Sequence, residues 1–576
     1  MVFRLVAMGL AAVAAADNIF SVDVTLPVNT NAVHYESPAC KVVLMENYVF
    51  GASYGKPYQG VFPIPACGSD VANSIVYLRF SASVPAGRQF DRIGAVWANG
   101  FELLRTTSQE PSRKTGATWE VLKDISHYKD VIAKGGNVVV ALDNVIDATY
   151  TSSFTVTVTA EFYRPKEACG SDVRATPRRP DTVLSISNPS GPYGWFTVQP
   201  SSSGASGSLV TVPRNTEALF LELFTSHHGC DEFWYTNPTN EFLQPLQTNC
   251  GNGAFREFQV LVDGELVGAV WPFPLIYTGG ISPYMWRPVV ATGAFEAPTY
   301  LVDITPFLGK VLDGKPHSIS FGVTYGLDYW PTTGNLLIYI DKEGNQTTAV
   351  VQSKTFPAPT TARVVSTAHG LDITLNTTAA RRSEISTLIT TSRGAKLYSV
   401  AQDFSFYNDQ VYTNNASTQW FDQRTIVTTT TTITPVGGAP ATQVLKENYP
   451  FSGNTTYVTY TSTEALPLRA DDLAVRRDIR REAAEQDGYK LNTTVDHAFL
   501  KSIASSGDAR HFPLGLSDFV VTIHQRADAY LDSLVGGTGF NTAILKAANA
   551  TGCYSHDVAG SVVNGITKNI QGSLCP

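Results

Sequence analysis

The sequence is poor in charge, in metal-binding motifs and in long apolar runs. Asp, Glu, Lys and Arg make up 16% of its 576 residues, and the formal net charge of −8 offers no basic surface for nucleic acid. After residue 16 no stretch reaches the roughly 18 to 20 apolar residues of a membrane helix. The histidines form no His-Glu-x-x-His motif and the cysteines no Cys-x-x-Cys motif. We therefore expect no nucleic-acid partner, no membrane segment in the mature chain, no metal and no cofactor.

Residues 1–16 have the layout of a secretory signal peptide. Arg4 precedes an apolar run that ends at Val13, and three alanines supply a cleavage site before Asp17. Glycosylation sequons of the form Asn-x-Ser/Thr follow, at Asn345, Asn376, Asn415, Asn454, Asn492 and Asn549. We expect a secreted protein, found outside the cell or in the lumen of the secretory pathway.

Seven cysteines in an oxidising compartment indicate disulfides, with one cysteine left over. Sequence does not determine connectivity, so the pairs are assigned by proximity along the chain. The predicted pairs are Cys40–Cys67, Cys230–Cys250 and Cys553–Cys575, which leaves Cys169 alone.

Short alternating runs rich in Val, Thr, Ile, Tyr and Phe, such as residues 153–163, predict a mostly β chain packed as sandwiches. An internal repeat supports this interpretation. Two apolar strands flank an Asn99-Gly100 turn, and two more flank an Asp263-Gly264 turn. Each hairpin is followed by an Asp-Ile-Ser/Thr element, beginning at Asp124 and at Asp303. We predict two copies of one β-sandwich.

The predicted copies span residues 17–165 and 181–345, joined by a polar, proline-rich linker at 174–180. From residue 350 to 576 the chain becomes rich in Thr and Ser, which predicts a third, β-rich domain carrying most sequons. Residues 471–489 are charge-rich and are predicted to be an exposed helix or loop.

Two irregular segments combine aromatic and reactive side chains. Residues 229–238 place Asp231 and Glu232 among aromatics, and residues 270–288 carry prolines and glycines that exclude a regular helix or central strand. Paired carboxylates beside aromatic faces suit sugar binding and acid–base hydrolysis. From the residues alone, a solvated loop at Asp231-Glu232 and a surface ion pair at Asp91-Arg92 are the favoured explanations of these acids.

Five motifs together resemble the acidic peptide:N-glycanase A family of plants and fungi. They are Ser53-Tyr54-Gly55-Lys56-Pro57, Gln89-Phe90-Asp91-Arg92, Asp231 to Pro238, Gly253-Ala254-Phe255-Arg256-Glu257 and Phe273 to Ile281. The resemblance covers roughly residues 30 to 345 closely. It implies a secreted amidase that hydrolyses the bond between N-acetylglucosamine and asparagine in N-glycosylated peptides or proteins, releases the glycan and leaves aspartate, without a metal.

A more distant similarity, to secreted bacterial peptide:N-glycanases, implies the fold and the site residues. The implied fold is all-β, with two tandem jelly-roll-like β-sandwiches and here a C-terminal Thr/Ser-rich β domain. Asp91 is similar to the catalytic aspartate and Glu232 to the essential glutamate. We expect Asp91 to activate water or to attack directly, and Glu232 to bind the sugar or donate a proton. The expected supporting residues are Arg92, Asp143, Asp231 and Glu257, and the expected substrate platforms are Trp234, Tyr235, Trp271 and Trp286.

Two other functions use the same residues. A glycoside hydrolase also needs two carboxyl groups, and a non-catalytic glycan-binding protein could use the same scaffold. A serine hydrolase is disfavoured, because the Gly-x-Ser-x-Gly match at residues 51–55 is followed by Lys56-Pro57 rather than by a helix.

Overall fold

A computed structural model describes residues 18–25, 38–67, 74–163, 178–200, 206–461, 487–516, 518–534, 536–549 and 552–572. The predicted signal peptide, Cys169, Cys575 and residues 471–486 lie outside these ranges, so the Cys553–Cys575 bridge stays a prediction. Residues 487–489 are described, and they begin a strand. Within the described ranges, no helix is both long and apolar enough to cross a membrane.

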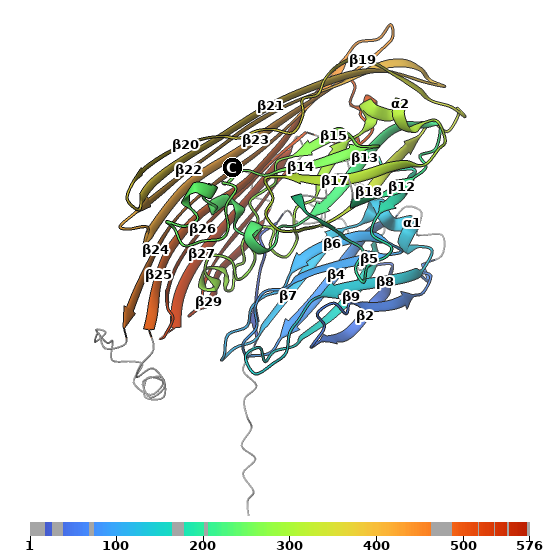
Figure 1. Cartoon of the computed structure of the whole chain (residues 1–576). Coiled ribbons are helices and arrows are strands. Elements are labelled where there is room, and N and C mark those ends of the chain that lie inside the picture. Colours follow the sequence, from blue (N-terminus) through green and yellow to red (C-terminus); the bar gives the residue numbers. More distant parts are fainter. Residues whose placement is uncertain are drawn as a thin grey trace, which may run out of the picture.

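The first sandwich consists of two antiparallel sheets that share one apolar core (Figure 1). One sheet has the order β2-β9-β4-β7, with β1 added in parallel at β7, and the other has the order β3-β8-β5-β6. The elements are β1 (Ile19–Phe20), β2 (Cys40–Phe50), β3 (Tyr58–Phe62), β4 (Ile75–Val84), β5 (Ile93–Ala98), β6 (Phe101–Thr107), β7 (Ala117–Asp124), η3 (Ser126–Tyr128), α1 (Lys129–Ile132), β8 (Gly136–Leu142) and β9 (Phe154–Tyr163). Buried residues alternate along β7 and β9, as expected for strands with one face in a core.

The second sandwich has the sheet orders β10-β18-β13-β16 and β12-β17-β14-β15, with β11 beside β18. Its strands are β10 (Thr182–Ile186), β11 (Phe196–Val198), β12 (Ser206–Val210), β13 (Thr216–Thr225), β14 (Glu257–Val262), β15 (Glu265–Val270), β16 (Tyr300–Asp303), β17 (His317–Thr324) and β18 (Trp330–Ile340). Its short helices are η5 (Gly229–Asp231), η6 (Trp234–Thr236), η7 (Asn240–Phe242), η8 (Pro283–Trp286), η9 (Thr305–Phe307) and α2 (Leu308–Val311).

The two sandwiches share one strand order, which confirms the predicted repeat. The hairpin β5–β6 occupies the same place as β14–β15, and both turns have two residues with positive φ, at 49° and 84° in Asn99-Gly100 and at 50° and 79° in Asp263-Gly264. The downstream elements also correspond. Asp124 accepts a hydrogen bond from the Ser126 amide at 2.8 Å, and Asp303 accepts one from the Thr305 amide at 2.9 Å.

The C-terminal part is one antiparallel sheet of 11 strands that packs along the second sandwich (Figure 1). Its elements are β19 (Thr348–Thr355), β20 (Arg363–His369), β21 (Asp372–Thr391), β22 (Gly394–Thr413), β23 (Thr418–Pro435), β24 (Ala441–Thr461), β25 (Asp487–Ser506), η11 (Ala509–His511), β26 (Phe519–Asp532), β27 (Gly536–Asn549), β28 (Gly552–Ser561) and β29 (Gly565–Gly572). Buried and exposed residues alternate along β21, because one face of the sheet meets the sandwich and the other meets solvent.

The disulfides Cys40–Cys67 and Cys230–Cys250 are present, as predicted. Five of the sequon asparagines have described side chains, and all five are exposed: Asn345, Asn376, Asn415, Asn454 and Asn492. Asn549 ends β27, and nothing is described of its side chain. The glycosylation of these sites stays a prediction.

A buried arginine, paired with an acid of its own strand, joins the two sandwiches through its other hydrogen bonds. Arg105 on β6 contacts Glu102 at 2.7 Å, and both side chains are almost fully excluded from solvent. The same guanidinium donates to Ser226 Oγ at 2.6 Å and to the Pro331 carbonyl at 2.8 Å, both in the second sandwich. The hydrogen bonds of Arg105 to Ser226 and Pro331 hold the sandwiches in one relative position. Removing Arg105 would also leave Glu102 buried without its cation, which lowers the free energy of unfolding.

Candidate active site

A cleft of about 440 Å³ opens between the two sandwiches. Four of the predicted site residues, Asp91, Arg92, Asp143 and Glu232, line it together. The other residues of the lining are Tyr54, Gly55, Ile93, Thr107, Pro192, Tyr193, Trp195, Thr197, His228, Tyr277, Tyr329 and Pro331. The structure therefore brings both predicted catalytic carboxyl groups to one place, each from a different sandwich.

Asp91 lies just before β5, against the 270–288 segment. Its Oδ2 accepts a hydrogen bond from the Gly279 amide at 2.8 Å. A side chain at Gly279 would collide with the Glu110 carboxylate and would reach within 3.0 Å of Asp91 Oδ1, so the approach requires glycine. Burial raises the pKa of Asp91, while the Gly279 amide and the Arg92 charge oppose this shift.

Glu110 is a carboxyl group that the sequence analysis missed. Its Oε1 accepts from the Asp91 amide at 3.3 Å, and its Oε2 contacts Arg287 at 3.1 Å. Burial, followed by the neighbouring Asp91 charge, raises the pKa of Glu110 to about 7. A signal was available: β5 pairs with β6 through Ile93 and Thr107, and continuing this register by two residues places Asp91 opposite Gln109, the neighbour of Glu110.

The adjacent acids Asp231 and Glu232 have opposite environments. Asp231 is fully buried and accepts from Arg256 at 2.8 Å, from the Leu327 amide at 2.7 Å and from Trp330 Nε1 at 3.0 Å. It therefore anchors the loop. Its neighbour Glu232 lines the cleft and accepts no hydrogen bond from any residue that the structure describes.

The pKa of Glu232 is raised to about 8, first by burial and then by the negative charges of Asp91 and Glu110. Asp91 receives an N–H donor and lies beside an arginine, whereas Glu232 has neither. The two carboxyl groups thus differ in their affinity for a proton, and Glu232 is the one that keeps it.

Asp143 is a third carboxyl group in the cleft, as predicted. It accepts from the Tyr193 hydroxyl at 2.5 Å and from the Gly55 amide at 3.3 Å, which fixes its orientation. Burial raises its pKa, and these hydrogen bonds oppose the shift. The Ser53-Tyr54-Gly55 motif thus contributes to the cleft wall, while the Ser53 hydroxyl is buried and bonded to the Leu142 carbonyl at 2.7 Å.

Two aromatic stacks form walls of the cleft. Tyr193 stacks on Trp195 with ring centroids 4.5 Å apart, and His228 stacks on Tyr329 at 5.3 Å. Burial lowers the pKa of His228 to about 3, so this imidazole stays neutral in mild acid. Such surfaces can carry the apolar face of a sugar ring.

The four aromatic residues predicted as substrate platforms, Trp234, Tyr235, Trp271 and Trp286, do not lie in the cleft. Each is at most 2% exposed and packs inside the protein. Trp286, for example, has a structural role: its indole N–H donates to the Gly280 carbonyl at 2.7 Å and stabilises the turn that carries Gly279.

Glu257, predicted as a supporting residue, also lies elsewhere. It is fully buried and accepts from Trp271 Nε1 at 2.9 Å and from Thr360 Oγ1 at 2.8 Å. Arg381 of the C-terminal sheet completes its surroundings at 3.5 Å. Its role is to join the second sandwich to that sheet, and Asp231 is likewise an anchor rather than part of the cleft surface.

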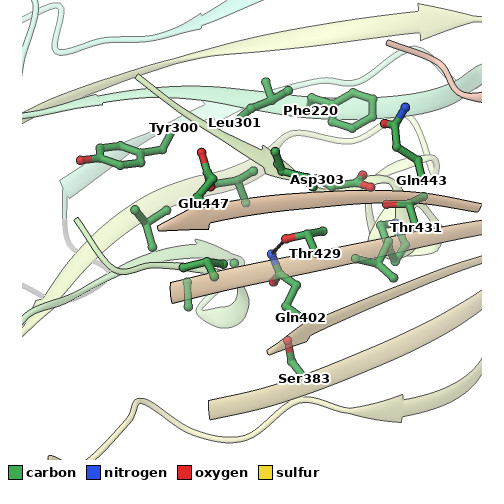
Figure 2. A pocket seen from close by; sticks show the side chains of 18 of the residues that line it. Phe220, Tyr300, Leu301, Asp303, Ser383, Gln402, Thr429, Thr431, Gln443 and Glu447 are labelled. Atoms are coloured by element: carbon green, nitrogen blue, oxygen red, sulfur yellow. Dashed lines mark hydrogen bonds between the residues drawn. The ribbon is translucent and has the colours of Figure 1, made fainter. Parts of the chain in front are cut away.

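A second cavity, of about 150 Å³, lies between the second sandwich and the C-terminal sheet (Figure 2). Its acids already have partners: Asp303 accepts from the Tyr398 hydroxyl at 2.8 Å, and Glu447 contacts Lys501 at 3.0 Å. The cleft is therefore the better catalytic candidate. Among the described residues, no group of three or more His, Cys, Asp or Glu side chains could hold a metal ion.

Comparison with known proteins shows the family of the chain. The family model for peptide N-acetyl-β-D-glucosaminyl asparaginase amidase A matches residues 27–356, and the model for the C-terminal domain of the same family matches residues 374–451. The chain belongs to this amidase A family. The Prunus dulcis protein named peptide-N4-(N-acetyl-β-glucosaminyl)asparagine amidase A is 36% identical over 415 residues, which cover 70% of this chain and 71% of that protein.

Solved structures show weaker similarity to this amidase A family member. PNGase F, a glycosylasparaginase from Flavobacterium meningosepticum, is 13% identical with a TM-score of 0.34, and the match covers 52% of this chain and 95% of that one. PNGF-II is 12% identical with a TM-score of 0.37, over 54% of this chain and 66% of that one. Similarity at this level says nothing about mechanism.

Proposed function

We propose that the protein hydrolyses the amide between N-acetylglucosamine and asparagine in N-glycosylated peptides, releasing the glycan and leaving aspartate. The observation that carries this proposal is the meeting of Asp91 and Glu232 in one cleft, with unequal proton affinity. An amide needs both an activated water and a protonated leaving nitrogen, and two carboxyl groups in different protonation states supply both.

Asp91 is the proposed base or nucleophile. Its carboxylate is supported by the Gly279 amide and the Arg92 charge, so it is the group that loses its proton first. It either removes a proton from the attacking water or attacks the asparagine side-chain carbonyl itself. Arg92 is held in place through its amide, which donates to Ser108 Oγ at 2.9 Å.

Glu232 is the proposed acid. With its pKa raised to about 8, it is protonated at neutral and mildly acid pH and can donate to the leaving nitrogen. Hydrolysis then breaks the amide C–N bond, places the hydroxyl of water on the acyl carbon and leaves the nitrogen on the sugar. Glu110, paired with Arg287, adds the negative charge that keeps Glu232 protonated.

The walls of the cleft suit a substrate with a sugar part and a peptide part. Tyr193 and Trp195 form one aromatic surface, and His228 with Tyr329 forms another. A bond between a sugar and a peptide would lie between them, near the carboxyl groups. The predicted signal peptide and the five exposed sequon sites support action in the secretory pathway or outside the cell.

A defined glycopeptide tests the proposal. The purified protein is incubated with it at mildly acid to neutral pH and the peptide product is weighed. The amidase route yields a peptide with aspartate, about one mass unit heavier than the asparagine peptide, whereas a glycoside hydrolase leaves asparagine intact. Saturable binding without turnover would instead indicate a glycan-binding protein.

A further inference from the structure

Residues 18–25, called here the N-terminal strap, contact all three parts of the protein. Ile19–Phe20 forms β1, which pairs in parallel with β7 of the first sandwich. Val22 bridges to Val289, in the loop after η8 of the second sandwich. Val24 is fully buried in an apolar cluster with residues of β26, β27 and β28 from the C-terminal sheet. The strap therefore touches all three parts, with Ser21 and Val24 buried and Phe20 left exposed.

One route of hydrogen bonds runs from the strap through Asp23. Its carboxylate accepts from the backbone amides of Gly293 at 3.0 Å and Phe295 at 2.8 Å, which fixes the turn between them. Ala294, inside that turn, accepts through its carbonyl from the Thr107 amide at 3.0 Å and from Thr107 Oγ1 at 2.7 Å. Thr107 lines the cleft.

The route continues from Thr107 to Arg92 and Asp91. The next residue, Ser108, donates its amide to the Arg92 carbonyl at 2.9 Å and accepts the Arg92 amide at its Oγ at 2.9 Å. Its carbonyl accepts from Thr278 Oγ1 at 2.5 Å. Thr278 precedes Gly279, whose amide donates to Asp91.

A second route starts at Ser21. Its Oγ accepts from Gln109 Nε2 at 3.1 Å, and the same amide group donates to the Trp286 carbonyl at 2.9 Å. Gln109 Oε1 accepts from the Glu110 amide at 3.0 Å, and Glu110 in turn accepts from the Asp91 amide. The two routes start at different residues of the strap, and both end at the adjacent residues Asp91 and Arg92.

Asp23 holds this turn with a carboxylate, a group whose removal from water costs free energy. Burial raises its pKa to about 7, the negative charge of Glu296 also raises it, and the hydrogen bonds that oppose this shift come from backbone amides. Among the residues that the structure describes, no cation pairs with this partly buried carboxylate, so backbone amides alone offset the loss of its hydration. Its three backbone donors at Gly293, Phe295 and Glu296 define one turn conformation.

We propose that the strap is a positioning element of the cleft, in which Asp23 and Ser21 hold Arg92 and Glu110, and through them Asp91, in their reactive geometry. Neither residue lines the cleft, so both are positioning residues. This inference rests on the proposed function. It makes the strap, which begins next to the predicted signal cleavage site at Asp17, a part of the catalytic unit.

The test is Asp23→Ala in the full chain. Displacing a reacting group by about 1 Å can cost on the order of 100-fold in rate, so we expect kcat on a glycopeptide to fall roughly 10- to 100-fold with KM changed by less than about threefold. Asp23→Asn keeps an oxygen that can accept from the turn and should restore most of kcat. Amide hydrogen exchange should speed up in peptides covering residues 105–111 and 276–282.

Asp341→Ala is the matched control. Asp341 is fully buried, and like Asp23 it holds a turn, by accepting the Ser392 amide at 2.7 Å and the Glu343 amide at 3.4 Å at the junction with the C-terminal sheet. It should lower the melting temperature and leave kcat unchanged. An equal fall of kcat in the two variants, or unchanged exchange in both peptides of Asp23→Ala, would overturn the proposal. If the wild-type protein does not hydrolyse the glycopeptide, the proposed function fails, and hydrogen exchange alone decides the role of the strap.

Discussion

The neighbouring carboxyl groups of Asp231 and Glu232 should respond in opposite ways to amide substitution. Glu232→Gln removes a group that faces the cleft and accepts no hydrogen bond from the described residues. Asp231→Asn removes the charge that accepts from Arg256 and Trp330 in the interior. Both changes preserve volume. The first should therefore act on turnover and the second on stability.

The magnitudes follow from these environments. A positioned acid contributes roughly 10²- to 10⁴-fold to the rate, so Glu232→Gln should lose that much. Breaking a buried ion pair costs about 3–5 kcal/mol, so Asp231→Asn should lower the melting temperature markedly. Burial raises the pKa of Glu232 from 4.5 to about 8 in the folded state. The contribution of this group to the free energy of unfolding therefore falls as the pH rises across that interval. Glu232→Gln cannot titrate, so at pH 7 to 8 it should melt at or above the wild-type temperature.

Two measurements check the pair. Mass spectrometry of a glycopeptide gives turnover, and thermal unfolding at pH 5 and pH 8 gives relative stability. Asp91→Asn serves as the positive control for lost turnover. If Asp231→Asn lost activity at an unchanged melting temperature while Glu232→Gln kept wild-type turnover, the assignment of the two acids would be reversed and the reasoning from burial would be refuted.

Three other outcomes are expected. Gly279→Ala should reduce kcat at least tenfold, while the control Gly264→Ala, in a hairpin turn where a Cβ meets no atom within 4 Å, should not. Equal turnover in the two variants would show that the close approach of Glu110 is unimportant. The rate should fall as pH rises above about 8, because Glu232 then loses the proton that it donates, and a pH–rate profile flat to pH 10 would contradict this role. Arg105→Met should destabilise the protein by about 3–5 kcal/mol, since it leaves Glu102 buried without its cation. An unchanged melting temperature in calorimetry would show that Arg105 does not stabilise the contact between the sandwiches.

Local chemistry made much of the fold predictable. The Asn99-Gly100 and Asp263-Gly264 turns specify tight hairpins because both positions adopt positive φ, which these residues tolerate. The Asp-x-Ser/Thr elements at Asp124 and Asp303 are also local, because the aspartate side chain accepts a hydrogen bond from the amide two residues later. The disulfides Cys40–Cys67 and Cys230–Cys250 join cysteines close in the sequence.

The sequence by itself therefore determined the β class, the repeated sandwich, and, through its motifs, Asp91, Arg92 and Glu232 as candidates, whereas Asp143 was a candidate only through the distant resemblance. It could not show that Trp271 and Glu257 face one another across a hairpin and away from the cleft, or that Glu110 approaches Asp91. Turns and caps depend on a few consecutive residues, whereas burial and the pairing of carboxyl groups depend on strands and loops brought together from different sheets. For that physical reason only the tertiary structure decided which of two adjacent acids anchors a loop and which faces the cleft.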